Sequence, residues 1–139
     1  MQYKYHVQGS VAELKTASEF VSHGFFVYFP ITSSAPFDFI AVKENNMYRV
    51  QVRSSSRKSK SDIYAMDLRS SNPLYYKNFD SSSCDILVCY LFQDDILCYV
   101  KSDEILNVSG IHFKNFRGKP NQHRQWIISD FTDFNRLGI

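Results

Sequence analysis

Two carboxylates, one amide and one guanidinium occur at spacings that suit phosphate chemistry, and they are Glu13, Asp38, Gln51 and Arg53. Gln51 and Arg53 are two residues apart, so in a β-strand their side chains lie on one face. Asp38 opens the preceding strand of a predicted hairpin and can lie beside them. Two carboxylates and an amide form an oxygen-only donor set, which suits Mg²⁺ better than zinc. Such a metal ion could polarise a phosphodiester and lower the pKa of a bound water.

Each of these residues also has a purely structural interpretation. Glu13 lies three residues after Ser10, which is the spacing of a helix capping box. Asp38 follows a proline-containing loop and can serve in a turn, while Gln51 and Arg53 can form the solvated face of an edge strand. Their joint occurrence in this order favours the catalytic interpretation.

The hydrophobic pattern predicts the elements that must position these residues. Helical spacing predicts an amphipathic helix over 11–23, capped by Ser10 and stopped by Gly24, with a buried stripe made of Val11, Leu14, Ala17, Phe20 and Val21. Runs rich in β-branched and aromatic residues predict strands at 25–30, 37–43, 47–54, 63–69, 84–92 and 96–100. A turn at 44–46 makes the second and third strands a hairpin, and a short helix is expected over 102–106. The order of elements predicts an α/β fold with a mixed central β-sheet flanked by helices.

Length and composition bound the classes of protein that remain. A chain of 139 residues with 44% hydrophobic and 22% charged residues is a folded protein, and we expect a single domain over 1–139. The sequence lacks both a long apolar run and a secretory signal, so no membrane partner is expected. Three cysteines in or beside apolar segments indicate a reduced chain, for which a cytoplasmic location is expected.

Basic residues gather in two stretches although the net charge is only +2. Arg, Lys and Ser side chains are common phosphate contacts, and several such contacts make affinity fall steeply with salt. The residues expected to contact DNA are Arg49, Ser55, Arg57, Lys58, Lys60, Arg69, Lys114, Arg117, Lys119 and Arg124. Solvated polar loops are the alternative for both stretches.

Four segments, taken in order, resemble the PD-(D/E)XK nuclease superfamily, and within it the small homing endonucleases of bacterial and cyanobacterial group I introns. The segments are G-S-x-A-E-L-K, G-F-x-V-x-x-P, S-x-x-P-F-D-F-I and Y-R-V-Q-V-R-S, within residues 8–70. The resemblance implies a restriction-endonuclease-like core with Glu13, Asp38, Gln51 and Arg53 at the catalytic positions.

The resemblance also implies what the protein acts on and with. It implies Mg²⁺-dependent, sequence-specific cleavage of double-stranded DNA, with Ca²⁺ as a non-catalytic substitute. The metal would be held by Glu13, Asp38, Gln51 and the Val52 carbonyl. The long sites that intron homing requires imply a homo-oligomer, a dimer or a tetramer. Its subunit contacts are expected at Tyr75, Tyr76, Phe79 and the region 113–116.

Position 53 departs from the family, which has lysine there. Arginine stays protonated and can neutralise phosphate charge, but it cannot act as a general base. We therefore expect Arg53 to preserve fold and DNA binding while weakening cleavage; Lys15 and Lys58 are the nearest conceivable substitutes. The main alternative is a catalytically impaired or inactive DNA-binding protein on the same fold. A small β-rich interaction protein without nucleic acid is the third reading.

Overall fold

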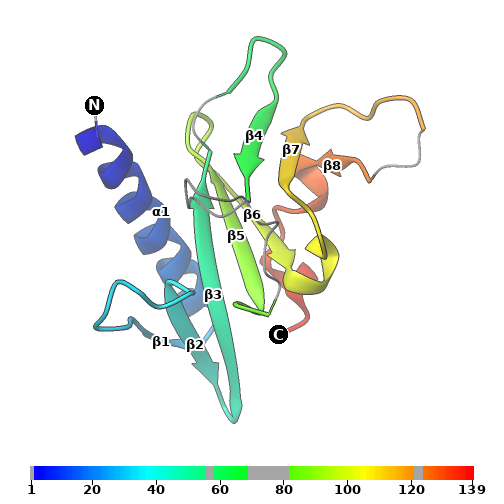
Figure 1. Cartoon of the computed structure of the whole chain (residues 1–139). Helices are drawn as coiled ribbons and strands as arrows, with labels where there is room; N and C mark the ends of the chain where they lie inside the picture. Colours follow the sequence, from blue (N-terminus) through cyan, green and yellow to red (C-terminus); the bar gives the residue numbers. More distant parts are fainter. Residues whose placement is uncertain (1, 56–57, 69–81, 121–123) are drawn as a thin grey trace.

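A long helix and a small sheet cover the two faces of a five-stranded central sheet (Figure 1). A computed structural model of the chain describes residues 2–55, 58–68, 82–120 and 124–139. The elements are α1 (Gln2–Ser22), β1 (Phe26–Tyr28), β2 (Phe39–Lys43), β3 (Asn46–Ser54), β4 (Tyr64–Asp67), β5 (Ile86–Leu91), β6 (Ile96–Lys101), β7 (Gly110–Lys114) and β8 (Trp126–Ile127). Three 3-10 helices complete the described part: η1 (Ser102–Ile105), η2 (Ile128–Asp130) and η3 (Phe134–Leu137).

The central sheet is mixed, as predicted, and has the strand order β1-β2-β3-β5-β6. β2 and β3 form the expected antiparallel hairpin, β3 runs parallel to β5, and β5 is antiparallel to β6. The prediction that the strand near 63–69 belongs to this sheet is wrong. β4 pairs instead with β7, and β7 with β8, in a separate three-stranded sheet. β5 occupies the place beside β3. The buried alternate residues of β4, Tyr64 and Met66, pack against the central sheet.

Two hydrophobic cores lie on the two faces of the central sheet. Alternate residues of β5 point into each of them, with Val88 on the α1 side and Cys89 on the side of the small sheet. All six residues of β5 are buried, which confirms the prediction of a central strand covered on both faces. The three cysteines are free and buried.

The helix differs from its prediction at both its start and its buried face. α1 begins at Gln2, so Ser10 lies inside the helix and does not cap it. The capping-box explanation of Glu13 is therefore excluded. Leu14 and Val21, predicted as core residues, are 65% and 57% exposed. Ala17 and Phe20 are buried as predicted, and Ala12 and Thr16 complete the face that packs on the sheet.

Small residues explain this change of face. Ala12 and Ala17 let the helix approach the sheet closely, and the buried Thr16 hydroxyl donates to the Ala12 carbonyl at 2.8 Å. Glu13 follows Ala12 at the edge of this buried face and is itself half-buried.

The segment whose form the sequence pattern leaves undecided, 126–134, forms β8, η2 and the start of η3. Phe134 packs edge-on against Phe20, with ring centroids 4.9 Å apart, and against Tyr99 at 5.3 Å. It also stacks on His23 at 3.8 Å. The end of the described chain thus closes the core between α1 and the sheet. None of the described helices is long and apolar enough to cross a membrane.

Candidate active site

Glu13 of α1 and Asp38, which immediately precedes β2, meet where the helix passes the first residues of the hairpin. Their carboxyl groups lie within hydrogen-bonding reach of each other. The Asp38 backbone N–H donates to the Val50 carbonyl at 2.8 Å, and Asp38 Oδ2 accepts the Val52 backbone N–H at 2.6 Å. Asp38 is therefore held against β3 by its own main chain and by its side chain.

The environment of Glu13 favours its protonated form. Burial, a hydrogen bond to Asp38 and the negative charge of Asp38 raise the pKa of Glu13 from 4.5 to about 7. Two carboxylates that face each other in a half-buried place need a shared proton or a cation between them. The pair is thus arranged to take up a cation as pH rises through about 7.

Gln51 supplies a polar atom that has no partner. Its Oε1 is buried and accepts no hydrogen bond from any residue that the structure describes. In the hairpin register Phe39 pairs with Val50, so Asp38 stands one step on, beside Gln51. A buried acceptor without a donor is costly unless a ligand completes it. Gln51 faces Asp38 across the hairpin, and an oxygen at that place fits a divalent cation with oxygen ligands.

The backbone supplies one more oxygen on the same side. The N–H of Val52 points towards Asp38, and in a strand the C=O of a residue points to the same side as its N–H. The Val52 carbonyl therefore faces the edge of β3 that Asp38 flanks. Within the described residues, no group of three or more His, Cys, Asp and Glu side chains could hold a metal. A metal here needs the amide and the carbonyl as well as the two carboxylates.

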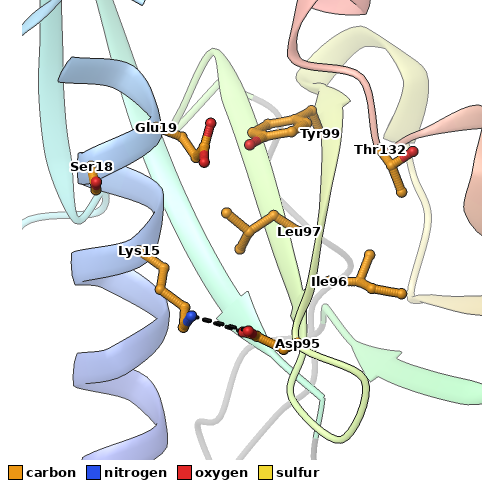
Figure 2. Close-up of a pocket in the computed structure, with 8 residues that line it drawn as sticks. All are labelled: Lys15, Ser18, Glu19, Asp95, Ile96, Leu97, Tyr99 and Thr132. Carbon is orange, nitrogen blue, oxygen red and sulfur yellow. Dashed lines mark hydrogen bonds and ion pairs between the residues drawn. The ribbon is translucent and has the colours of Figure 1, made fainter. Parts of the chain in front are cut away.

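A cavity of about 330 Å³ opens beside the carboxylate pair. It is lined by Glu13, Asp38 and the loop after β1, in which Ile31 is fully exposed. A larger cavity of about 530 Å³ lies between α1 and β6, next to Tyr99 (Figure 2). That cavity is not lined by Asp38, so we assign the site from the carboxylate pair and not from cavity size.

Arg53 lies on the sheet face opposite α1, with its guanidinium near two cysteines of the core. Burial raises the pKa of the Cys84 thiol to about 12, and the positive charge of Arg53 opposes this shift. Cys89 is the residue of β5 that pairs with Arg53. Burial raises the pKa of its thiol, and the positive charge of Arg53 opposes this shift too. The guanidinium is therefore not among the charges that set the pKa of Glu13.

Comparison with known proteins gives the family. The model of the PD-(D/E)XK endonuclease family matches residues 3–136. The chain belongs to the PD-(D/E)XK endonuclease family. Nucleases of this family generally use divalent metal ions, which agrees with the oxygen donors around Asp38. No curated protein matches the sequence.

A solved structure shares the fold. A bacterial homing endonuclease, I-Ssp6803I, superposes with a TM-score of 0.72 and 19% sequence identity, over 91% of this chain and 86% of that one. At this identity the likeness shows the PD-(D/E)XK fold. It agrees with the predicted fold class and with the resemblance seen in the motifs.

Several residues predicted to contact DNA are engaged within the protein. Arg49 donates from two guanidinium nitrogens to both oxygens of Asp85, at 3.3 and 3.1 Å. Ser55 is 1% exposed, so its hydroxyl would have to leave the core to reach a phosphate. Arg49 is thus paired within the protein and Ser55 is buried, and a contact of either residue with DNA stays a prediction.

The second basic stretch is also largely paired. Arg117 contacts Asp130 at 3.0 Å, and Arg124 contacts Glu104 at 2.8 Å while lying over the Trp126 ring. Of the remaining predictions, Lys60 and Lys119 are exposed, and the Lys114 ammonium lies over the Phe116 ring. Arg57 and Arg69 lie outside the described residues.

The residues predicted to form subunit contacts differ in their exposure. Phe113 is fully buried in the core beneath the small sheet, so it is not available to a second subunit. Phe116 is 48% exposed. Tyr75, Tyr76 and Phe79 lie outside the described residues.

Lys15 and Lys58, considered as substitutes for the family lysine, are both held by aspartates of the β5–β6 turn. Lys15 contacts Asp95 at 2.9 Å and Lys58 contacts Asp94 at 2.9 Å. Each lysine is far from its aspartate in the sequence, so these ion pairs carry no local sequence signal and form only in the folded protein.

Proposed function

We propose that this chain is a Mg²⁺-dependent endonuclease that cleaves double-stranded DNA at a specific sequence, as homing endonucleases of group I introns do. The observation that carries the proposal is the orphaned Gln51 oxygen beside a carboxylate pair in which Glu13 has a pKa of about 7. Ca²⁺ is expected to occupy the same place without supporting cleavage.

Each residue of the site has a specific role in the proposed hydrolysis. Glu13, Asp38, Gln51 and the Val52 carbonyl would hold the cation, and Glu13 must lose its proton to do so. Asp38 keeps its orientation because the Val52 N–H binds one of its oxygens. A bound Mg²⁺ supplies Lewis acidity and a more acidic water.

Arg53 has a narrower role than the family lysine. The water oxygen bonds to phosphorus, one bridging P–O bond breaks, and the leaving oxygen must gain a proton. A guanidinium stays charged throughout, so Arg53 stabilises phosphate charge and does not take the proton from water. We therefore expect slow cleavage by this chain.

The partners we propose are DNA and further copies of the same chain. One uncovered row of the sheet runs from Phe26 through Val42 to Met47, and its two ends are 69% and 65% exposed. This apolar row supports a dimer or tetramer, which sedimentation of the free protein would measure. The buried free cysteines are consistent with a reducing, cytoplasmic location.

The rival function is a DNA-binding protein without cleavage, and the observation that favours it is the arginine at position 53. The test is cleavage of a plasmid carrying the target site, with Mg²⁺, by this chain and by Arg53→Lys and Asp38→Ala. We expect Arg53→Lys to cleave about tenfold or more faster, as for a positioned acid–base group. Asp38→Ala should reduce cleavage by about a thousandfold.

The controls separate the two functions. Both variants should bind the target DNA in Ca²⁺ as this chain does or nearly so. Binding without cleavage by this chain and by Arg53→Lys would favour the rival.

A further inference from the structure

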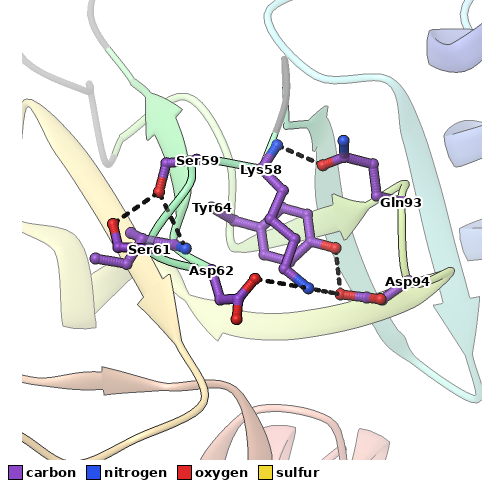
Figure 3. A network of polar contacts seen from close by, with 8 residues as sticks. Lys58, Ser59, Ser61, Asp62, Tyr64, Gln93 and Asp94 are labelled. Atoms are coloured by element: carbon purple, nitrogen blue, oxygen red, sulfur yellow. Dashed lines mark hydrogen bonds and ion pairs between the residues drawn. The ribbon is translucent and has the colours of Figure 1, made fainter.

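The turn between β5 and β6 places two neighbouring aspartates on opposite faces of the central sheet. Asp95 binds the Lys15 ammonium of α1 (Figure 2). It also accepts the Tyr90 hydroxyl at 2.8 Å. Asp94 binds the Lys58 ammonium and accepts the hydroxyl of Tyr64 (Figure 3). One turn therefore contacts both the helix that carries Glu13 and the segment that follows β3.

Lys58 is held at several of its atoms. Its ammonium lies 2.9 Å from Asp94 and 3.7 Å from Asp62, and its backbone N–H donates to the Gln93 side-chain oxygen (Figure 3). The same ammonium lies over the Tyr64 ring, 5.5 Å from the centroid. With its side chain 26% exposed, Lys58 is engaged by groups of the protein itself.

The segment from Lys58 to Tyr64 is closed by its own hydrogen bonds. The Ser59 N–H donates to the Ile63 carbonyl at 2.9 Å, and the Asp62 N–H returns to the Ser59 carbonyl at 3.1 Å. Lys60 is exposed at the tip of this closed segment. These hydrogen bonds hold Lys60 in a closed loop, and the contacts of Lys58 and Tyr64 with Asp94 join the two ends of that loop to the β5–β6 turn.

Asp94 holds this segment by more than a surface ion pair. An exposed pair such as Lys15–Asp95 contributes little by itself. Asp94 is also the acceptor for Tyr64, as Asp95 is for Tyr90, but only Tyr64 lies next to the segment that contains Lys60. A buried hydroxyl that loses its acceptor is costly, so the loss of Asp94 releases the lysine and the tyrosine together.

We propose that Asp94 is a positioning residue for DNA: it fastens Lys58 and Tyr64, so that the exposed Lys60 stands ready for a phosphate, while Lys58 is a structural latch and not a phosphate contact. The DNA part of this inference rests on the proposed function. The latch itself is a property of the free protein.

The first test is amide hydrogen exchange in the free protein, comparing Asp94→Ala with Asp95→Ala. Both variants remove one carboxylate from the same turn, so their change in net charge is identical. Exchange at residues 58–63 should accelerate about tenfold in Asp94→Ala and stay unchanged in Asp95→Ala. Equal exchange in both variants would overturn the latch. If Asp94→Ala does not fold, Asp94→Asn keeps an acceptor for Tyr64, removes the charge that holds Lys58, and should accelerate exchange several-fold.

The second test is the salt dependence of DNA binding, measured in Ca²⁺. Lys60→Met should lower the slope of log affinity against log salt by about one, and adding Lys58→Met to Lys60→Met should lower it no further, because Lys58 acts only by positioning Lys60. The Lys58→Met and Asp94→Ala effects on affinity should not add, because both open the same latch. A loss of slope in Lys58→Met that persists in the Asp94→Ala background would overturn the assignment of Lys58.

The two tests separate the latch from the proposed function. Faster exchange in Asp94→Ala without any DNA binding would sustain the latch and reject the nuclease. Unchanged exchange in a chain that cleaves DNA would reject the latch alone.

Discussion

Two half-buried glutamates of this protein have opposite surroundings. Burial alone would raise the pKa of Glu104, but hydrogen bonds from Arg136, the Lys101 backbone N–H and Arg124 lower it to about 2. Glu13 faces another carboxylate, Asp38, and burial together with that neighbour raises its pKa to about 7. Glu104 is thus surrounded by positively charged side chains and an N–H donor, whereas Glu13 faces a like charge.

This difference distinguishes a structural charge from a functional one. Glu104 receives two hydrogen bonds of 2.8 Å from the Arg136 guanidinium, which also donates to the Tyr99 carbonyl. It joins η1, β6 and η3 into one unit. Around Glu13 the same kind of side chain is left with a like charge and an orphaned amide oxygen nearby. The sign of the neighbouring charges, and not the extent of burial, therefore distinguishes Glu13 from Glu104.

The largest effect on stability is expected at Glu104, whose negative charge is paired with Arg124 and Arg136. Glu104→Gln leaves Arg136 without its counter-charge, with side chains that are 12% and 19% exposed in the native pair. We expect a loss of about 3 kcal/mol in the free energy of unfolding, measured by urea denaturation. The folded pKa of Glu104 is lowered, so its contribution is present above about 4.5 and disappears as pH falls towards about 2. An equal loss in Glu13→Gln would contradict the comparison.

The opposite sign is expected at Glu13. Its folded pKa is raised, so stability is highest below pH 4.5 and falls as pH rises through about 7. Glu13→Gln should remove this fall and, without metal, be more stable than the natural chain at pH 8 by about 1 to 2 kcal/mol after allowance for solvent screening. Thermal unfolding between pH 4 and pH 8 measures it. A parallel pH profile for the two proteins would refute the raised pKa.

A smaller, more specific effect is expected on metal binding. Because Glu13 must lose a proton, Ca²⁺ affinity should rise as pH increases through about 7, with release of up to about one proton. Calorimetry in two buffers of different ionisation heat measures the released proton. Gln51→Leu should weaken Ca²⁺ binding, whereas the shape-matched Gln51→Glu should retain it. Binding that is independent of both pH and position 51 would move the metal elsewhere.

The sequence predicted those parts of the fold that depend on local pattern. The β2–β3 hairpin follows from alternation around a turn, and this hairpin brings Asp38 beside Gln51. The start of α1 was not predictable from Ser10, because the residues before it continue the helix and override the local capping signal.

Pairings between distant segments had no local signal. Arg49 has the same character in the sequence as any basic residue of a DNA-binding strand, yet Asp85 engages it in the folded chain. The assignment of β4 to a second sheet likewise depends on β7, which comes much later in the chain. Residue type and spacing were enough to predict the carboxylate pair. Which basic side chains are paired within the protein depends on tertiary contacts, which the sequence pattern does not show.

The position of Phe134 has a consequence for biosynthesis. α1 is translated before Phe134, whose ring packs against Phe20, His23 and Tyr99. Until that ring docks, Phe20 and His23 of α1 lack one of their packing partners. A ribosome-bound fragment that stops short of this phenylalanine therefore carries every acidic side chain of the site on a helix whose packing is incomplete.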